Sequence, residues 1–350
     1  VEGFKEKDNG VEVLLKDNPS LQADMVVLAI GVTPDTVLAK EAGLELGIKE
    51  SIVVNDRMET SVPDIYAAGD AVQVKHYVTG NDALISLAGP ANKQGRIIAD
   101  NICGGDSRYL GSQGSSVIKV FDMTAATTGI NETNAKKSGL EVDTVILSPM
   151  SHAGYYPGGK VMTMKVVFEK ETYRLLGAQI IGYEGVDKRI DVLATAIHAG
   201  LKATQLKDLD LAYAPPYSSA KDPVNMAGFM IDNIAKGTLK QWHLEDMDKI
   251  SKDKSVVLLD VRTVGEFNRG HMDGFKNIPV DELRERINEI EKGKPVYLIC
   301  QSGLRSYIAS RILEGNGYET YNFSGGFRFY DAVVNDRALI EKAYACGMDY

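Results

Sequence analysis

The residues best suited to chemistry lie near the carboxyl end of the chain, around Cys300. The run Val296–Ile299 predicts a buried strand that ends at this cysteine, and apolar residues at helical spacing predict a helix over Arg305–Leu313. The loop between them consists of Gln301, Ser302, Gly303 and Leu304. Main-chain N–H groups of such a loop, together with Arg305, favour a thiolate over a thiol. We therefore expect Cys300 to attack a sulfane sulfur and carry it as a persulfide, taken from an anionic donor such as thiosulfate.

A neighbouring strand is expected to brace this loop. The run Val256–Val261 is rich in β-branched and leucine residues, which predicts a buried strand. Asp260 and Arg262 lie two residues apart and share a face, which favours an ion pair that supports the loop over a catalytic role for either residue. His271 lies in a loop between glycines, and we interpret it as a structural hydrogen-bonding residue and not as a general base.

Roughly residues 247–350 resemble the rhodanese family. The resemblance is carried, in order along the chain, by Leu259-Asp260-Val261-Arg262, Glu266-Phe267 with Gly270-His271-Met272-Asp273-Gly274, Asn277-Ile278-Pro279, Cys300-Gln301-Ser302-Gly303-Leu304-Arg305-Ser306, and Ser324-Gly325-Gly326. The resemblance implies a rhodanese-like α/β/α domain that transfers sulfur through Cys300. The family often has arginine directly after this cysteine. Here Gln301 removes one positive charge, which leaves the sulfur donor and acceptor open.

A second group of candidate residues lies in the first third of the chain. The string from Thr60 to Ala71 predicts a buried strand that ends at Gly69, where the backbone can approach a ligand closely. It resembles the second FAD motif of the pyridine nucleotide-disulfide oxidoreductase family. The string 87–96 looks like the helix of that family whose amino end faces the flavin ring. The resemblance implies FAD contacts from Ser61, Gly69, Asp70, Ala71 and Ala88.

Residues 115–235 look like the dimerisation domain of the same family, which implies a homodimer. The strings 154–158, 212–217 and 221–223 are similar to the coenzyme A disulfide reductases. In that group two tyrosines of one subunit reach the redox cysteine and substrate of the other. The resemblance places those roles on Tyr155 and Tyr213, and makes Lys221 a contact for a coenzyme A phosphate.

The chain departs from that family in one large respect. It contains no Gly-x-Gly-x-x-Gly fingerprint and no cysteine at a position that resembles the family's redox cysteine. FAD, NAD(P)H and coenzyme A are therefore expected for the intact enzyme, whereas this chain by itself is expected to bind flavin weakly or not at all. Two alternatives to a sulfurtransferase stay open: a non-catalytic dimerisation and docking module, and a flavin-dependent disulfide reductase if the amino-terminal part is supplied.

Composition narrows the choice of partners. The 350 residues carry a formal net charge of −9, which argues against nucleic acid or an anionic membrane as the main partner and favours small thiols, persulfides or thiosulfate. The apolar runs are too short to span a bilayer, and the first ten residues do not resemble a secretory signal. Three scattered cysteines, Cys103, Cys300 and Cys346, suggest neither a disulfide framework nor a metal site, so we expect a cytoplasmic protein. Cys103 is expected to be inert, and Cys346 could be a spare thiol.

The alternation of predicted strands and helices indicates an α/β protein with several domains. We expect residues 1–33 to be the end of an NAD(P)H-binding domain and residues 34–114 the carboxyl-terminal part of a Rossmann-type FAD-binding domain. Residues 115–243 are expected to form an α+β dimerisation domain, and residues 244–350 a rhodanese domain. The run Lys236–His243 is expected to be an exposed connection.

Overall fold

A computed structural model describes the backbone of residues 1–343 and the side chains of residues 1–334. The chain forms two compact units. The first consists of residues 1–73 and 91–109, and the second of residues 74–90 and the chain from Leu110 onward. No helix in the described part of the chain is long and apolar enough to cross a membrane.

The first unit begins with a small antiparallel sheet, in the order β1 (Gly3–Lys7), β2 (Gly10–Leu14) and β3 (Leu21–Ala23). The predicted strand near Val11 is confirmed by β2. The prediction of a buried strand at Met25–Ile30 is wrong, since this run forms no strand and Ile30 is 89% exposed. Because no strand among the described residues pairs with it, its backbone has no ladder to join.

The rest of the first unit is built from short elements. These are α1 (Val37–Glu41), β4 (Ile52–Val53), the beginning of β5 (Val72–Lys75) and most of α2 (Ala88–Ile102). β4 and β5 pair in parallel, with Ile52 opposite Val72. The strand expected at Asp64–Ala67 is replaced by a single bridge between Glu59 and Tyr66. Asp64 has a φ of 64°, which takes its backbone out of the extended conformation.

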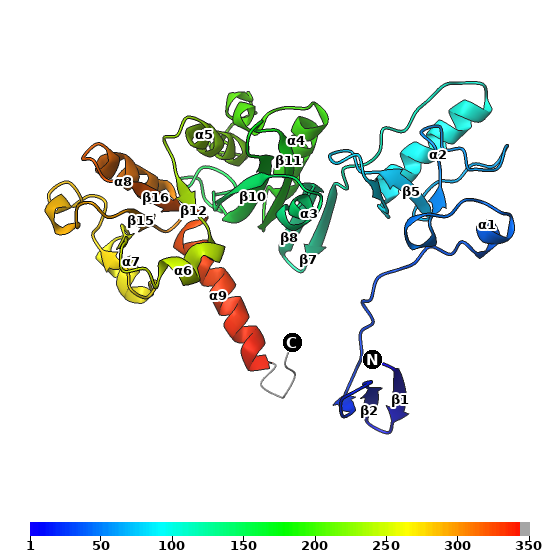
Figure 1. The fold of residues 1–350 in the computed structure, drawn as a ribbon, viewed down its shortest axis with the longest axis horizontal. Helices are drawn as coiled ribbons and strands as arrows, with labels where there is room; N and C mark the ends of the chain where they lie inside the picture. The colour runs from blue at the N-terminus through cyan, green and yellow to red at the C-terminus, as the bar shows by residue number, and fades with distance from the viewer. Residues whose placement is uncertain (344–350) are drawn as a thin grey trace. The chain divides into compact units, whose positions relative to one another are not determined.

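The second unit begins with the end of β5, which pairs antiparallel with β6 (Asp82–Ala83). A five-stranded antiparallel sheet follows, in the order β7 (Ser116–Val120), β8 (Met123–Gly129), β11 (Leu175–Gly182), β10 (Met162–Glu169) and β9 (Val142–Leu147). The helices of this layer are α3 (Glu132–Lys137), α4 (Val186–His198) and α5 (Pro223–Ala235). α4 packs on β8 and β11 while α5 contacts β9 and α4, so both cover one face of the sheet (Figure 1).

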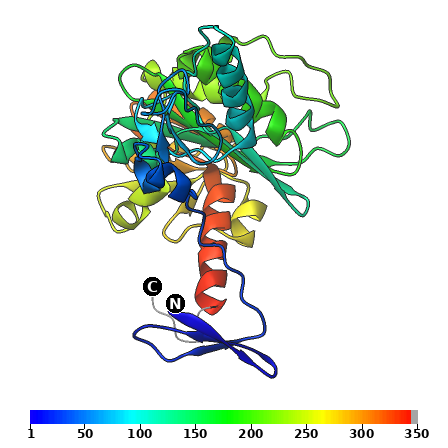
Figure 2. The ribbon, with the colours of Figure 1, turned by 90° about the vertical axis from the view of Figure 1, so that its right-hand side faces the viewer.

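The carboxyl-terminal part of the second unit is built on a parallel sheet. Its strand order is β12 (Gln241–Trp242), β16 (Thr320–Phe323), β15 (Val296–Ile299), β13 (Val257–Asp260) and β14 (Lys276–Asn277). Its helices are α6 (Met247–Ile250), α7 (Val264–Arg269), α8 (Leu304–Glu314) and α9 (Gly326–Ala343). Figure 2 shows α9 as one uninterrupted helix. The α/β fold expected for this part is confirmed.

The prediction that residues Lys236–His243 form an exposed connection is wrong in one important respect. Trp242, the single tryptophan of the chain, is only 2% exposed and lies on β12, the edge strand of the parallel sheet. Its ring packs on Phe323, with the ring centroids 4.5 Å apart. Aromatic burial of this size outweighs the polar residues around it and draws the segment into the sheet.

Candidate active site

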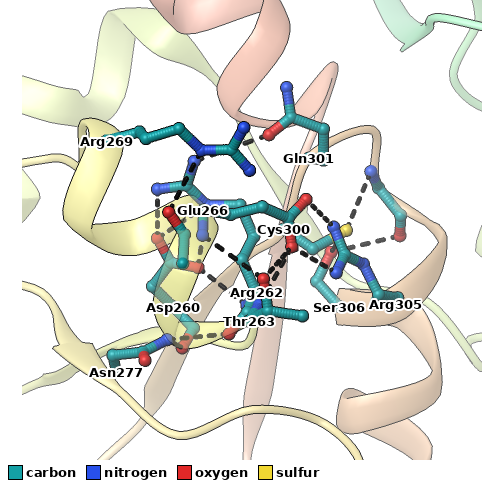
Figure 3. A network of polar contacts seen from close by, with 12 residues as sticks. Asp260, Arg262, Thr263, Glu266, Arg269, Asn277, Cys300, Gln301, Arg305 and Ser306 are labelled. Atoms are coloured by element: carbon teal, nitrogen blue, oxygen red, sulfur yellow. Dashed lines mark hydrogen bonds and ion pairs between the residues drawn. The ribbon is translucent and has the colours of Figure 1, made fainter.

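Cys300 lies at the carboxyl end of β15, directly before the loop that leads into α8. Its side chain is only 1% exposed, but the sulfur does not face a purely apolar interior. The Gly303 N–H donates to Sγ at 3.1 Å, and the Ser306 hydroxyl lies 3.2 Å from it (Figure 3). The expected arrangement of a sulfur at a strand-to-helix junction, facing a main-chain amide, is therefore present.

Two neighbouring elements hold the Cys300 loop in this shape. Gly303 has a φ of 98°, a conformation that favours glycine, and this turns its N–H towards the sulfur. On the other side the first N–H groups of α9 satisfy the loop carbonyls: Phe327 donates to the Cys300 oxygen at 2.8 Å and Arg328 to the Gln301 oxygen at 3.1 Å. The loop carbonyls are thus bound to α9, and the loop amide is left for the sulfur.

Arg305 does not occupy the place that the sequence suggested. Its described hydrogen bonds go to Glu266, with both nitrogen–oxygen distances at 2.7 Å (Figure 3). The Arg305 guanidinium holds the pKa of the Glu266 carboxyl down to about 2, against 4.5 ordinarily. Glu266 also accepts from the Thr263 N–H at 3.0 Å, and its own N–H donates to the Thr263 hydroxyl oxygen at 3.3 Å, which together form the capping box of α7. Arg305 therefore ties α8 to α7.

The ion pair expected between Asp260 and Arg262 is present and fully buried. Arg262 Nη2 lies 2.7 Å from Asp260 Oδ2, and the same nitrogen donates to the Gly270 carbonyl at 2.8 Å. Its guanidinium also lies 3.8 Å from the centre of the Phe327 ring and reaches Gln301 Oε1 at 3.5 Å. Through these contacts the pair joins β13, α9 and the Cys300 loop.

A cavity of about 380 Å³ opens beside Gln301. Its lining combines three arginines with two carboxylates, namely Arg262, Arg269, Arg328, Glu266 and Asp331, together with Gly270 and Phe327. The other residues of the predicted loop differ in exposure: Gln301 and Ser302 are half-buried, and Leu304 is 66% exposed. The side of the loop that carries Gln301 is thus the one that faces polar surroundings suited to an anion.

The Glu266 pKa gives a pH-dependent prediction. A carboxylate whose pKa is lowered on folding stabilises the fold fully above its unfolded pKa of about 4.5, and this stabilisation is lost as the pH falls towards 2. We expect Glu266→Gln to lower stability by about 1 kcal/mol at pH 7, because the pair is partly open to solvent. Urea titrations followed by Trp242 fluorescence should show this difference shrinking between about pH 5 and about pH 2. A difference that stays constant over this range would contradict the assignment.

Gly326 supports the loop by lying directly against it. It has a φ of 68°, and a Cβ added there would come 2.6 Å from the Ser302 nitrogen and 2.7 Å from the Gln301 carbonyl. We expect Gly326→Ala to push the loop away and to slow sulfur transfer about tenfold. Gly293→Ala is the matched control, because Gly293 has a φ of 83° but nothing within 4 Å of an added Cβ. If Gly326→Ala keeps the same activity as Gly293→Ala, the contact between residue 326 and the loop does not control the rate.

The two tyrosines singled out in the sequence meet in the structure. The hydroxyl oxygens of Tyr155 and Tyr213 lie 2.8 Å apart although the residues are 58 positions apart in sequence. The hydrogen bond to Tyr155 raises the pKa of the Tyr213 phenol. Lys221 is exposed and immediately precedes Asp222, whose side chain caps α5. Tyr213 also lines a cavity of about 530 Å³.

The residues expected to contact flavin are found in different surroundings. Gly69 has a φ of 88°, and its N–H donates to Gln94 Oε1 at 2.7 Å. Asp70 is exposed at the turn before β5, with Ala71 beside it half-buried, and the Ser61 hydroxyl accepts from the Glu45 N–H at 2.8 Å. Ala88 is the first residue of α2 and belongs to the second unit, whereas the others belong to the first.

Three further residues discussed from the sequence are His271, Cys103 and Cys346. His271 Nδ1 lies 3.1 Å from the Phe267 carbonyl oxygen and its ring stacks on Phe267, in keeping with a structural role. Cys103 is exposed just after α2, and Cys346 lies outside the described residues. The sequence reasoning missed Ser306 as a neighbour of the sulfur and Glu266 as the partner of Arg305. A Thr-x-x-Glu capping pattern at Thr263 could have drawn attention to Glu266, whereas Ser306 is one turn along α8 and only the helix geometry shows its proximity.

Three protein-family models match the chain. The pyridine nucleotide-disulphide oxidoreductase model matches residues 1–95, its dimerisation domain matches residues 115–223, and the rhodanese-like domain matches residues 243–332. The chain thus carries a pyridine nucleotide-disulphide oxidoreductase segment, the dimerisation domain that belongs with it, and a rhodanese-like domain behind the dimerisation domain.

Individual relatives agree with this assignment. The chain is 39% identical over 214 residues to an NAD(P)H sulfur oxidoreductase (CoA-dependent) of Pyrococcus furiosus. The matched residues make up 61% of this chain and 48% of that protein. The structure is similar to that of reduced Bacillus anthracis CoADR-RHD, with a TM-score of 0.90, 47% identity, and coverage of 95% of this chain and 59% of that one. An NAD-dependent persulfide reductase from A. fulgidus gives a TM-score of 0.85, with 40% identity and coverage of 94% and 60%. The chain thus spans about half the length of the curated relatives it matches.

Proposed function

We propose that this chain transfers sulfane sulfur through a persulfide on Cys300. The observation that carries the proposal is the position of Sγ, within 3.1 Å of the Gly303 N–H and 3.2 Å of the Ser306 hydroxyl at a strand-to-helix junction. Both groups can donate to a sulfur anion, and neither can donate to an alkyl side chain. A cysteine that served only as a small apolar residue has no need of these donors.

The reaction follows from the nucleophilic sulfur. The Cys300 thiolate attacks the sulfane sulfur of a donor such as thiosulfate, the donor's S–S bond breaks, and sulfite leaves with the electron pair. The Gly303 amide and the Ser306 hydroxyl lie at hydrogen-bonding distance from this sulfur. A thiol or cyanide then attacks the outer sulfur, and the Cys300 thiolate leaves and is regenerated. No net oxidation of the protein occurs in the cycle.

We further propose that the first part of the chain acts in the NAD(P)H-dependent reduction of a coenzyme A disulfide or persulfide, with FAD as the electron carrier. The relatives' names describe reductions of this kind. Gly69, in its left-handed conformation, and the exposed Asp70 fit the edge of an FAD site, although the Gly69 amide itself is already bonded to Gln94. When bound, FAD would accept hydride from NAD(P)H and pass electrons to the sulfur substrate.

In this proposal the tyrosine pair handles the proton of the thiol product. One phenol donates to the other at 2.8 Å, so the pair can deliver a proton from an exposed position. We propose a homodimer in which Tyr155 and Tyr213 reach the partner's reacting sulfur, with Lys221 placed to meet a coenzyme A phosphate.

The test of the sulfurtransferase is a search for the persulfide itself. The purified chain is incubated with thiosulfate or polysulfide, digested without reductant, and examined by mass spectrometry. We expect the peptide that contains Cys300 to gain the mass of one sulfur atom and to lose it on addition of cyanide, while the Cys103 peptide stays unchanged. Sulfur on neither peptide, or equally on both, would refute the proposal and leave the docking module as the better reading.

A further inference from the structure

Arg189 lies at the ends of two loops, one of which carries Tyr155 and the other Tyr213. It projects from α4 and is only 1% exposed. Its Nη2 makes contacts with four acceptors, which are the Ser151 carbonyl at 2.9 Å, Asp222 Oδ2 at 3.0 Å, Ser218 Oγ at 3.1 Å and the Tyr217 carbonyl at 3.4 Å. One buried cation therefore holds backbone on two separate segments of the chain.

These two segments are the bases of the tyrosine loops. The Ser151 carbonyl lies just before the loop that carries Tyr155, and Tyr217 and Ser218 close the loop that carries Tyr213. The bases are also joined directly, because the Ala153 N–H donates to the Ser218 carbonyl at 2.9 Å. At the other end of the loops the two phenol oxygens meet.

Packing at the tips cannot fix this geometry. The Tyr155 side chain is 76% exposed and that of Tyr213 is 46% exposed, so neither ring is held by a surrounding core. The distance between the two hydroxyl oxygens must then be set by the ends of the loops, which are bonded to Arg189 on α4.

The backbone around Arg189 is adapted to it. Gly185, at the beginning of α4, has a φ of 69°, and a Cβ added there would lie 2.1 Å from Arg189 Nη1. The Gly185 carbonyl accepts from the same Nη1 at 3.2 Å. Asp222 is 2% exposed and also accepts from Ser218 Oγ at 2.6 Å, so the charge of the arginine is balanced inside the protein.

We propose that Arg189 is the positioning residue of the Tyr155–Tyr213 pair. It touches neither phenol and acts by fixing the bases of the two loops against α4. The inference rests on the proposed function for the catalytic meaning of the pair, while the geometry that it explains does not depend on any activity.

The test measures the distance between the phenols by oxidative cross-linking. Brief photo-oxidation with a ruthenium complex and persulfate joins neighbouring tyrosines, and peptide mass spectrometry of the monomeric fraction quantifies the Tyr155–Tyr213 product. The stacked pair Tyr297 and Tyr321, with ring centroids 4.8 Å apart, serves as the reference in the same molecule. We expect Arg189→Met to lower the ratio of the two products at least about fivefold.

Three further variants make the outcome decisive. Arg174→Met is the matched control, because Arg174 donates to the Val78 carbonyl and to neither tyrosine loop. The ratio of the Tyr155–Tyr213 product to the reference product should equal that of the wild type in this variant. Arg189→Lys keeps the charge beside Asp222 but cannot reach all four acceptors, so its ratio should lie between those of wild type and Arg189→Met. If Arg189→Met does not fold, as judged by its far-ultraviolet circular dichroism and the loss of a cooperative urea transition, Ser218→Ala removes one acceptor and should still lower the ratio about twofold.

An unchanged ratio in folded Arg189→Met, or in Ser218→Ala where that variant replaces it, would overturn the inference. In an enzyme that reduces its substrate, the lower ratio should be accompanied by a fall in kcat with little change in KM. A lower ratio in a chain that reduces no disulfide or persulfide would uphold the role of Arg189 and reject the reductase proposal, so the two can fail separately.

Discussion

Replacement of Cys300 by serine should lower the rate of sulfur transfer to cyanide by about a thousandfold or more. A serine hydroxyl is a weak nucleophile without an adjacent base, and it cannot hold a transferred sulfur as a persulfide. The Gly303 amide and the Ser306 hydroxyl would then face an oxygen atom that has no role in the reaction. The measurement is the initial rate of thiocyanate formation from thiosulfate and from polysulfide.

Cys103→Ser provides the matched control for this experiment. Cys103 is an exposed thiol in the other compact unit, so the same chemical change is made where no catalytic role is expected. Its rate should equal that of the wild type. Retention of full activity by Cys300→Ser would reject the persulfide mechanism and support a docking role for the carboxyl-terminal domain.

Arg262→Met should cause the largest loss of stability, about 3 to 5 kcal/mol. The change leaves the Asp260 carboxylate, which is 0% exposed, without its buried partner, and it also removes the bond to the Gly270 carbonyl. Burying one unpaired charge costs more than the net contribution of an intact pair. Urea unfolding followed by Trp242 fluorescence reports this domain selectively, since Trp242 is the only tryptophan and lies on its parallel sheet.

The control for this prediction is Arg269→Met. Arg269 is exposed, and its described hydrogen bond goes to the Gly265 carbonyl of its own helix. We expect its unfolding free energy to change by no more than about 0.5 kcal/mol. Similar midpoints for the two variants would show that the Asp260–Arg262 pair contributes little to the fold.

The sequence predicted well those elements whose pattern is set by their own residues. The strand before Cys300 was expected at its observed bounds, and the helix after it within one residue at each end, because an apolar run and helical spacing lie on either side of a glycine-containing loop. Met25–Ile30 has an equally apolar pattern but forms no strand. A strand needs a neighbour to pair with, and that requirement cannot be read from the strand itself.

In the candidate site, too, the features set by nearby residues were predictable from the sequence and those set by distant residues were not. The position of Cys300 and the pairing of Asp260 with Arg262 followed from local spacing. The partner of Arg305 did not, because Glu266 is 39 residues away and its approach depends on how α7 and α8 pack. The contact between Gly326 and the Gln301 carbonyl likewise arises only when the amino end of α9 meets the loop.

The near-complete burial of Cys300 has a chemical consequence beyond the transfer step. The inner sulfur is screened from large electrophiles, so bulky thiol reagents should modify the exposed Cys103 first. In the proposed persulfide the outer sulfur would lie about 2 Å from Sγ, the length of one S–S bond. Burial of Sγ would then protect the cysteine from irreversible oxidation while the outer sulfur is the atom that is transferred.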